Sequence, residues 1–286
     1  MTTITRPLVS IVIPSYNHAR YLERCLTSVF AQTYDKMEII AIDDGSDDES
    51  VPFLRRLARL SPVPITILEQ DNKGAGYTIN RAIGLSSGDY INILNSDDAF
   101  PPDRIATLLS HLSDSGSEFI FSGVRFIDDA EMDVSEVDDY AIGLVQKQSE
   151  IKDFLTVGFA AIKSNVAIST GNFLFSRQLY DSVGVFNNFK YCHDWDFLLR
   201  CLVQVEPIYL AQPLYFYRLH LQNSFRTLAD VAGHEGPTLM RQYFQSVRGR
   251  LTPNPLAPCY YNWGEYFWSF IEEINYWQYL DFKGRG

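Results

Sequence analysis

Four short apolar runs alternate with helix-like segments in the first 115 residues, and this alternation constrains the fold more than any other feature. The runs are "LVSIVI" (8–13), "MEIIAID" (37–43), "PITILEQ" (64–70) and "YINILN" (90–95). After the first run, "YLERCLTSVFAQT" (21–33) places its apolar residues on one face of a helix. Strands that alternate with helices form a mostly parallel sheet that helices cover on both faces. We therefore predict an α/β fold built around one main core.

Polar clusters follow three of these predicted strands. They are "PSYN" at 14–17, "DDGSDD" at 43–48 and "NSDD" at 95–98. Each cluster alone has a simpler interpretation as a turn or a helix cap. Ligands of such sheets bind outside the carboxyl ends of the strands, where the connecting loops converge. Three polar clusters at one edge therefore favour a ligand site.

The chemistry of the last two clusters indicates a nucleotide and a metal ion. Asp97 and Asp98 can supply oxygen ligands to a hard divalent cation that also binds substrate phosphate. A helix cap is the alternative, but Pro101 and the residues after it suffice to start the next helix. Asp44 is able to accept hydrogen bonds from a base or a ribose, although an Asx-turn would explain the same residue.

The second half of the chain contains a further strand and helix pattern. We expect a strand in "SEFIFSGVRFID" (117–128) and then a solvated, mobile acidic segment at 128–140, with a lid as the alternative. A helix is predicted from about 148 and ends at Gly158. Further predictions are a strand in "TGNFLFS" (170–176), a helix in "HDWDFLLRCLVQ" (193–204) and an extended segment in "PIYLAQPLYFYRLH" (207–220).

Two side chains of this half are candidates for chemistry. Asp194 and Asp196 point in different directions on the predicted helix, so at most one of them faces a cleft. Asp194 is our candidate base, which would take the proton from an attacking hydroxyl, and a helix N-cap is its alternative role. His220 ends the aromatic run. It is either a hydrogen-bonded structural residue or a group that completes a cation or diphosphate site.

Bulk composition excludes several classes of function. A formal net charge of −11 argues against a nucleic-acid partner, although a bound cation would still allow a phosphate-bearing ligand. The four cysteines have no CxxC spacing, which predicts buried thiols in a reducing compartment. No run approaches the roughly 20 apolar residues that a membrane-spanning helix needs. We expect a cytoplasmic protein.

The aromatic segment "YYNWGEYFWSFIEEINYWQYL" (260–280) has its large residues near helical spacing. A core-packing helix or a homodimer face is favoured over a membrane-surface helix. The reason is that its polar side chains include Glu272 and Glu273, where membrane-surface helices carry lysine and arginine. Peripheral association with the inner face of the membrane stays open as the alternative.

In this order, the motifs resemble the inverting family 2 glycosyltransferases of GT-A fold. The likeness covers residues 8–225 and is carried by "VSIVIPSYNHARYLERCLTSVFAQTYDKMEIIAIDDGSDD", "DNKGAGYTINRAIGLSSGDYINILNSDD", "GNFLFSRQLYDSVGVFNNFKYCHDWDFLLR" and "YRLHLQNS". It implies one domain (1–225) with a nucleotide-sugar-binding half (1–115) and an acceptor-binding half (116–225). It does not cover the residues after 225, where we expect a helical, aromatic-rich C-terminal extension (226–286).

The same resemblance implies a reaction. A hexosyl or N-acetylhexosaminyl group would pass from a UDP-linked donor, with Mn or Mg, to a hydroxyl of a glycan or glycolipid acceptor in cell-surface polysaccharide biosynthesis. Pro14 and Tyr16 would border the nucleoside and Asp44 would bind the base or ribose. Asp97 and Asp98 would form the end of the DxD-type metal motif, with Asp97 also facing the donor.

Two further residues match functional positions of the family, and two other residues differ from the family pattern. Asp194 matches the position of the base, and His220 matches a histidine near the diphosphate and metal. The family commonly has Asp where this chain has Asn95, and Glu where it has His193. The alternative function is a catalytically weakened nucleotide-sugar-binding protein of the same fold. A nucleotidyltransferase is disfavoured because "PSYNHARY" lacks a glycine-rich phosphate loop.

Overall fold

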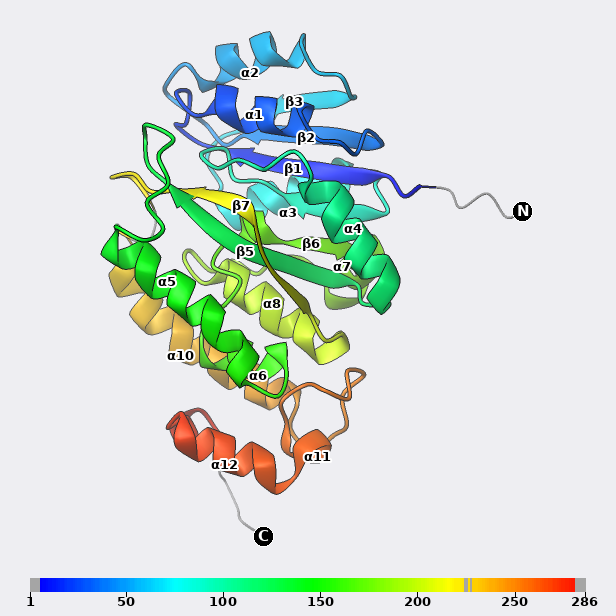
Figure 1. The fold of residues 1–286 in the computed structure, drawn as a ribbon, viewed down its shortest axis with the longest axis vertical. Helices are drawn as coiled ribbons and strands as arrows, with labels where there is room; N and C mark the ends of the chain where they lie inside the picture. Colours follow the sequence, from blue (N-terminus) through cyan, green and yellow to red (C-terminus); the bar gives the residue numbers. More distant parts are fainter. Residues whose placement is uncertain (1–5, 224–225, 227, 281–286) are drawn as a thin grey trace, which may run out of the picture.

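A seven-stranded sheet forms the centre of the molecule (Figure 1), and the computed structural model describes residues 6–223, 226 and 228–280. The strands lie in the order β3-β2-β1-β4-β6-β5-β7. β6 pairs antiparallel with β4 and with β5, whereas the other neighbouring strands are parallel. The bounds are β1 (Val9–Ser15), β2 (Met37–Asp43), β3 (Ile65–Glu69), β4 (Tyr90–Ile93), β5 (Phe119–Ile127), β6 (Leu174–Ser176) and β7 (Ile208–Arg218). The prediction of an α/β fold with a mostly parallel sheet is confirmed.

Helices cover both faces of the sheet because successive residues of each strand point to opposite sides. In β1, Ile11 and Ile13 pack with α1, α2 and α4, whereas Val12 belongs to the core shared with α3, α6, α7 and α8. The bounds are α1 (Leu22–Phe30), α2 (Ser50–Ala58), α3 (Ala75–Leu85), α4 (Arg104–Ser115), α6 (Val157–Lys163), α7 (Arg177–Val183) and α8 (His193–Gln204).

The acidic segment 128–140 differs from the expected mobile loop. The carboxylate of Asp128 accepts hydrogen bonds from the backbone N–H groups of Ala130 and Met132 at 2.8 and 2.9 Å. The backbone then returns to β5, where the N–H of Val134 donates to the carbonyl of Phe126 at 2.8 Å. The segment is therefore a tight turn held on the sheet.

Helix α5 (Asp139–Ser149) follows this turn, and a 3₁₀ turn η1 (Glu150–Asp153) comes next. The predicted helix end at Gly158 is wrong, because α6 begins at Val157 and runs through that glycine. A Cβ at Gly158 would lie 2.7 Å from a methyl group of Leu202, so glycine is needed where α6 packs on α8. The strand predicted at 170–176 is shorter: a 3₁₀ turn, η2 (Thr170–Asn172), precedes β6.

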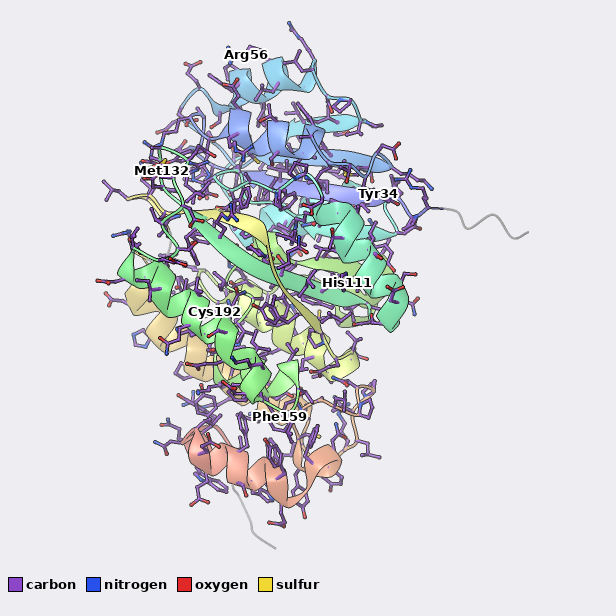
Figure 2. The ribbon with its side chains drawn as sticks, viewed as in Figure 1. Tyr34, Arg56, His111, Met132, Phe159 and Cys192 are labelled. Carbon is purple, nitrogen blue, oxygen red and sulfur yellow. The ribbon has the colours of Figure 1, made fainter. Side chains whose placement is uncertain are left out.

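The C-terminal segment packs onto the same core as the sheet. Its elements are α10 (Ala229–Ser246), α11 (Tyr260–Trp263), α12 (Glu265–Glu273) and η3 (Trp277–Tyr279). Gly264, with φ of 56°, separates α11 from α12 where the aromatic spacing indicated one helix. Phe270 of α12 lies 4.7 Å, between ring centroids, from Phe159 of α6, which is labelled in Figure 2. This contact supports the core-packing alternative for the aromatic segment.

Two expectations about bulk properties can be checked directly. All four cysteines are free and buried, as predicted. Within the ranges that the structure describes, no helix has the length and apolar character needed to cross a membrane.

Candidate active site

A cleft of about 690 Å³ lies at the carboxyl ends of β1, β2 and β4. All three polar clusters line it, through Pro14 and Tyr16 after β1, Asp44 after β2 and the segment 95–98 after β4. The opposite wall comes from the second half of the chain and includes Asp194. The clusters converge because the parallel strands β1, β2 and β4 all end at this edge of the sheet.

Asp97 and His18, which line this cleft, and the buried His220 beside Asp97 lie close enough together to hold a cation. Oδ2 of Asp97 lies 3.0 Å from Nε2 of His220 and 3.8 Å from Nε2 of His18. One ligand atom from each residue can be chosen so that all three lie within 4.8 Å of one another. Nδ1 of His18 contacts Ser96 Oγ at 2.8 Å, which fixes the orientation of the ring. A carboxylate with two imidazoles suits a first-row transition ion better than Mg²⁺, which prefers oxygen ligands.

Asp98 is not part of this group, although we predicted it as a metal ligand. Both of its carboxylate oxygens accept hydrogen bonds from the protein. Oδ1 accepts from the backbone N–H of Arg218 at 2.8 Å, and Oδ2 accepts from the hydroxyl of Tyr215 and from Asn95 Nδ2. The side chain is 2% exposed. The geometry therefore favours Asp97 over Asp98 as the carboxylate that would face a cation.

The pKa shifts of Asp97 and Asp98 distinguish the two carboxylates in the same way as their contacts do. Burial opposes the ionisation of Asp97, but nearby His18 and the hydrogen bond with His220 outweigh it and lower the pKa of Asp97. Burial and the adjacent charge of Asp97 instead raise the pKa of Asp98. Asp97 is the carboxylate of this pair that is held ionised.

Asn95 lies where the family pattern has an acid, and its amide connects two loops. Nδ2 donates to Ser169 Oγ at 2.9 Å and to Asp98 Oδ2 at 3.3 Å, and Oδ1 accepts from Thr170 Oγ1 at 3.3 Å. An aspartate could make neither donation. It would also add a third carboxylate beside Asp97 and Asp98. The amide therefore fits this chain's own packing.

The side chain of Arg218 anchors the segment 95–98, which contains the candidate cation ligand Asp97. Its side chain, which is almost fully buried, donates to the carbonyl oxygen of Asp97 at 2.9 Å and to that of Asp128 at 2.7 Å. It also forms an ion pair with Glu131, which a second arginine, Arg24 of α1, contacts at 2.9 Å. The acidic turn is therefore a support for the segment 95–98, which explains why it is fixed on the sheet.

Asp44 organises the loop opposite the cation group. Its carboxylate accepts hydrogen bonds from Gln70 Nε2 at 2.7 Å and from the backbone N–H groups of Lys73 and Gly74 at 2.8 Å each. A carboxylate has about four acceptor positions, so roughly one of them is left for a ligand. The turn interpretation and a ligand-binding role are thus compatible.

Asp194 lines the cleft and Asp196 does not, which agrees with the expectation that at most one of them faces it. Asp194 Oδ2 accepts from Asn165 Nδ2 at 2.7 Å, and Oδ1 accepts from the backbone N–H of Trp195 at 2.7 Å. Asp196 points away and pairs with Arg200 at 2.9 Å. Burial raises the pKa of Asp194, which makes its carboxylate a stronger base.

Sequence reasoning missed two residues of this site. His18 follows "PSYN" directly, so its place beside the first cluster was a usable signal. Glu235 lies on α10 and had no local signal. Its carboxylate accepts from the backbone N–H groups of residues 190, 191 and 192 at 2.8, 2.9 and 2.9 Å. Those amides precede α8, so a side chain of the C-terminal segment caps the helix that carries Asp194.

Comparisons with known proteins agree with this geometry. Residues 10–184 match the family model described as glycosyl transferase family 2. An uncharacterized glycosyltransferase of Rickettsia prowazekii is 30% identical over 228 residues, which are 78% of this chain and 68% of that protein. The glycosyltransferase GlyG of Streptococcus pneumoniae is 25% identical over 230 residues, covering 79% of this chain and 75% of that protein. Chondroitin synthase of Escherichia coli is 40% identical over 103 residues, 36% of this chain and 15% of that one.

Two solved structures have a similar fold. TarS 1–349 of S. aureus in complex with UDP-GlcNAc has a TM-score of 0.68 and 14% identity, covering 93% of this chain and 71% of that one. The mannosyltransferase PcManGT of Pyrobaculum calidifontis in complex with GDP-Man and Mn²⁺ has a TM-score of 0.65 and 18% identity, covering 95% and 74%. The chain spans 42% of a longer TarS chain.

Proposed function

The chain belongs to glycosyltransferase family 2 and is a glycosyltransferase of GT-A fold, and from that premise we propose how it works. It uses a nucleotide-diphosphate sugar, UDP-linked, together with a divalent cation. It transfers the sugar to a hydroxyl group with inversion at the anomeric carbon. The observation that carries this proposal is the closeness of Asp97, His18 and the buried His220 at a cleft that Asp97, His18 and Asp194 line.

The donor is held in the half of the cleft formed by residues 14–98. Pro14 and Tyr16 border the nucleoside, and the ring of Tyr16, which is 47% exposed, would stack on a base. Asp44 receives a hydrogen bond from the base or ribose at its remaining acceptor position. Asp97, His220 and His18 would hold the cation, which would offset negative charge on the leaving diphosphate. The Mn²⁺ and GDP-Man bound by the mannosyltransferase of similar fold support this assignment.

Asp194 acts as the base on the acceptor side. Its carboxylate takes the proton of the acceptor hydroxyl as the oxygen attacks the anomeric carbon. The hydrogen bond from Asn165 orients the carboxylate, and burial keeps it basic enough to accept the proton. Attack from the face opposite the leaving diphosphate gives inversion.

We propose a glycan or glycolipid of a cell-surface polysaccharide as the acceptor, and a hexosyl or N-acetylhexosaminyl group as the sugar. The stretch of 103 residues shared with chondroitin synthase supports a polysaccharide product, and the UDP-GlcNAc in TarS supports a UDP-linked sugar. Four free, buried cysteines support a reducing compartment such as the cytoplasm. Contact with the inner face of the membrane and a homodimer through residues 226–286 stay predictions.

A donor screen tests the proposed function. The chain is incubated with UDP- and GDP-linked sugars, with Mn²⁺ or with a chelator, and released nucleotide is measured. We expect release from a UDP-linked sugar only when metal is present. UDP binding without consumption of any donor would instead indicate the alternative, a nucleotide-sugar-binding protein that has lost turnover.

A further inference from the structure

Acidic and basic side chains that line the cleft come from different parts of the chain. Among the described residues that line it, the donor half (14–98) has three aspartates and neither lysine nor arginine. The acceptor half (140–232) has one carboxylate, that of Asp194, and three lysines from three different elements. These are Lys147, Lys163 and Lys190. The chain has a net charge of −11 and only seven lysines, so this wall departs from the overall composition.

The protein itself does little to neutralise these lysines. Lys163 lies 3.9 Å from the carboxylate of Glu150, and both side chains are well exposed, so that pair is weak. Lys147 and Lys190 have no carboxylate within ion-pair distance in the described parts of the chain. The nearby acids are already engaged, Glu235 by three backbone N–H groups and Asp194 by its own partners.

A second observation points to a ligand in the same place. Nδ1 of His193 and Oδ1 of Asn165 are buried and have no hydrogen-bond partner in the protein. Both residues line the cleft beside Asp194. Buried polar atoms are nearly always paired, so unpaired atoms in a cleft indicate groups that a ligand completes. Hydroxyl groups of an acceptor would satisfy both atoms.

We infer that the acceptor carries a phosphate or carboxylate group close to the hydroxyl that Asp194 deprotonates. The inference rests on the proposed function and names its substrate class. In the reaction, the bond between the anomeric carbon and the diphosphate oxygen breaks, and a bond to the acceptor oxygen forms. The hydroxyl proton passes to Asp194, and the nucleoside diphosphate leaves with the electron pair. Lysines suit the acceptor anion because each is a point charge on a flexible stem.

The diphosphate of the donor is the other anion in the cleft, and we place it at the candidate cation group. The cation group at Asp97, His220 and His18 would supply positive charge there. The three lysines belong to segments after residue 140, as Asp194 does. The experiment must nevertheless distinguish binding of an acceptor anion by the lysines from binding of the donor diphosphate.

Calorimetry with three matched probes tests the inference. Methyl glucoside, its 6-carboxylate and its 6-phosphate are titrated into the full chain saturated with UDP and Mn²⁺. We expect both charged probes to bind at least roughly tenfold more tightly than the neutral one in about 20 mM salt, and the difference to narrow at about 300 mM. The double variant Lys147→Ala/Lys190→Ala should lose the preference.

The matched control is Lys36→Ala/Lys152→Ala, which removes the same charge from two exposed lysines outside the cleft. It should keep the preference, and both double variants should bind UDP with Mn²⁺ as the unmodified chain does. Equal binding of neutral and charged probes, or no binding of either charged probe, would overturn the inference. So would weaker UDP binding in Lys147→Ala/Lys190→Ala, since the lysines would then hold the donor. Failure of the unmodified chain to bind UDP would contradict the proposed function itself.

Discussion

Asp97 and Asp98 are adjacent in the chain, yet their different surroundings indicate different roles. Asp98 is enclosed by donors from β7 and from Asn95, so its carboxylate ties the segment after β4 to the end of the sheet. Asp97 has part of its surface in the cleft and two imidazoles beside it. A carboxylate whose acceptor positions are filled by the protein has little left for a cation. We therefore propose that Asp97 binds the cation and that Asp98 has a structural role.

At the residue scale, Asp194→Asn separates catalysis from binding. An amide cannot take the proton of the acceptor, so transfer should fall by about 10²- to 10⁴-fold while UDP affinity is unchanged. Stability should change little, because removal of a buried charge offsets the loss of one of the two hydrogen bonds that Asp194 accepts. Burial raises the pKa of Asp194 in the folded state, so its ionised form at neutral pH weakens the fold, and the substitution removes that charge. Transfer rates, calorimetry and thermal unfolding give the three readouts.

The pH dependence of the transfer rate follows from the raised pKa of Asp194. Asp194 must be ionised to act as a base, so the transfer rate should fall as pH drops through its pKa. Because that pKa is raised, the fall should begin above the usual aspartate range near about 4. Transfer that persists in Asp194→Asn would show that another group is the base.

At the element scale, α10 and α8 are coupled through Glu235. Glu235→Gln replaces one of two anionic oxygens with a donor that faces backbone N–H groups, so the segment 190–192 should loosen. We expect the turnover rate to fall by about tenfold, because Asp194 is displaced, with UDP affinity unchanged. Hydrogen exchange at the amides of 190–192 should speed up. Glu272→Gln, on the exposed face of α12, is the matched control. An unchanged turnover rate in Glu235→Gln would contradict the coupling.

The elements that sequence reasoning predicted well are those with a strong apolar period. The helix predicted at 193–204 has those bounds in the structure, because its apolar residues recur at helical spacing. Helix α5 was missed because Ala141 is its only buried apolar residue, and it begins at the end of an acidic run. The polar clusters were placed together correctly because parallel strand ends meet at one edge. The contact of Glu235 with residues 190–192 joins segments more than 40 positions apart, and no local pattern marks it.

At the scale of the whole molecule, the segment that the family resemblance left uncovered is part of the fold. Leu239 and Tyr243 of α10 and Phe267 and Phe270 of α12 are buried in one core with residues of the sheet. Burial of each such side chain stabilises by about 1.5 to 3 kcal/mol, and a whole domain is stable by only about 5 to 15 kcal/mol. The division at residue 225 therefore marks where the resemblance ends, and the core continues across it.

Truncation tests this view of the molecule. A chain that ends at residue 228 should be insoluble or should lack a cooperative thermal transition, because the core under α10 and α12 would be exposed to water. Near-ultraviolet circular dichroism and thermal unfolding of the full and truncated chains measure the difference. A truncated chain that melts at the same temperature and binds UDP would show that residues 229–286 are a separable addition.

Calorimetric titration of UDP, with and without Mn²⁺, into the unmodified chain, Asp97→Asn and Asp98→Asn tests the central claim most directly. Both substitutions remove one carboxylate from the same segment, but Asp97 lies beside the two imidazoles, whereas Asp98 accepts its hydrogen bonds from Arg218, Tyr215 and Asn95. We expect Mn²⁺ to strengthen UDP binding by at least about tenfold in the unmodified chain and in folded Asp98→Asn, and to have no effect in Asp97→Asn. UDP binding that ignores Mn²⁺ in the unmodified chain, or an effect of Mn²⁺ that survives in Asp97→Asn and disappears in Asp98→Asn, would contradict the account.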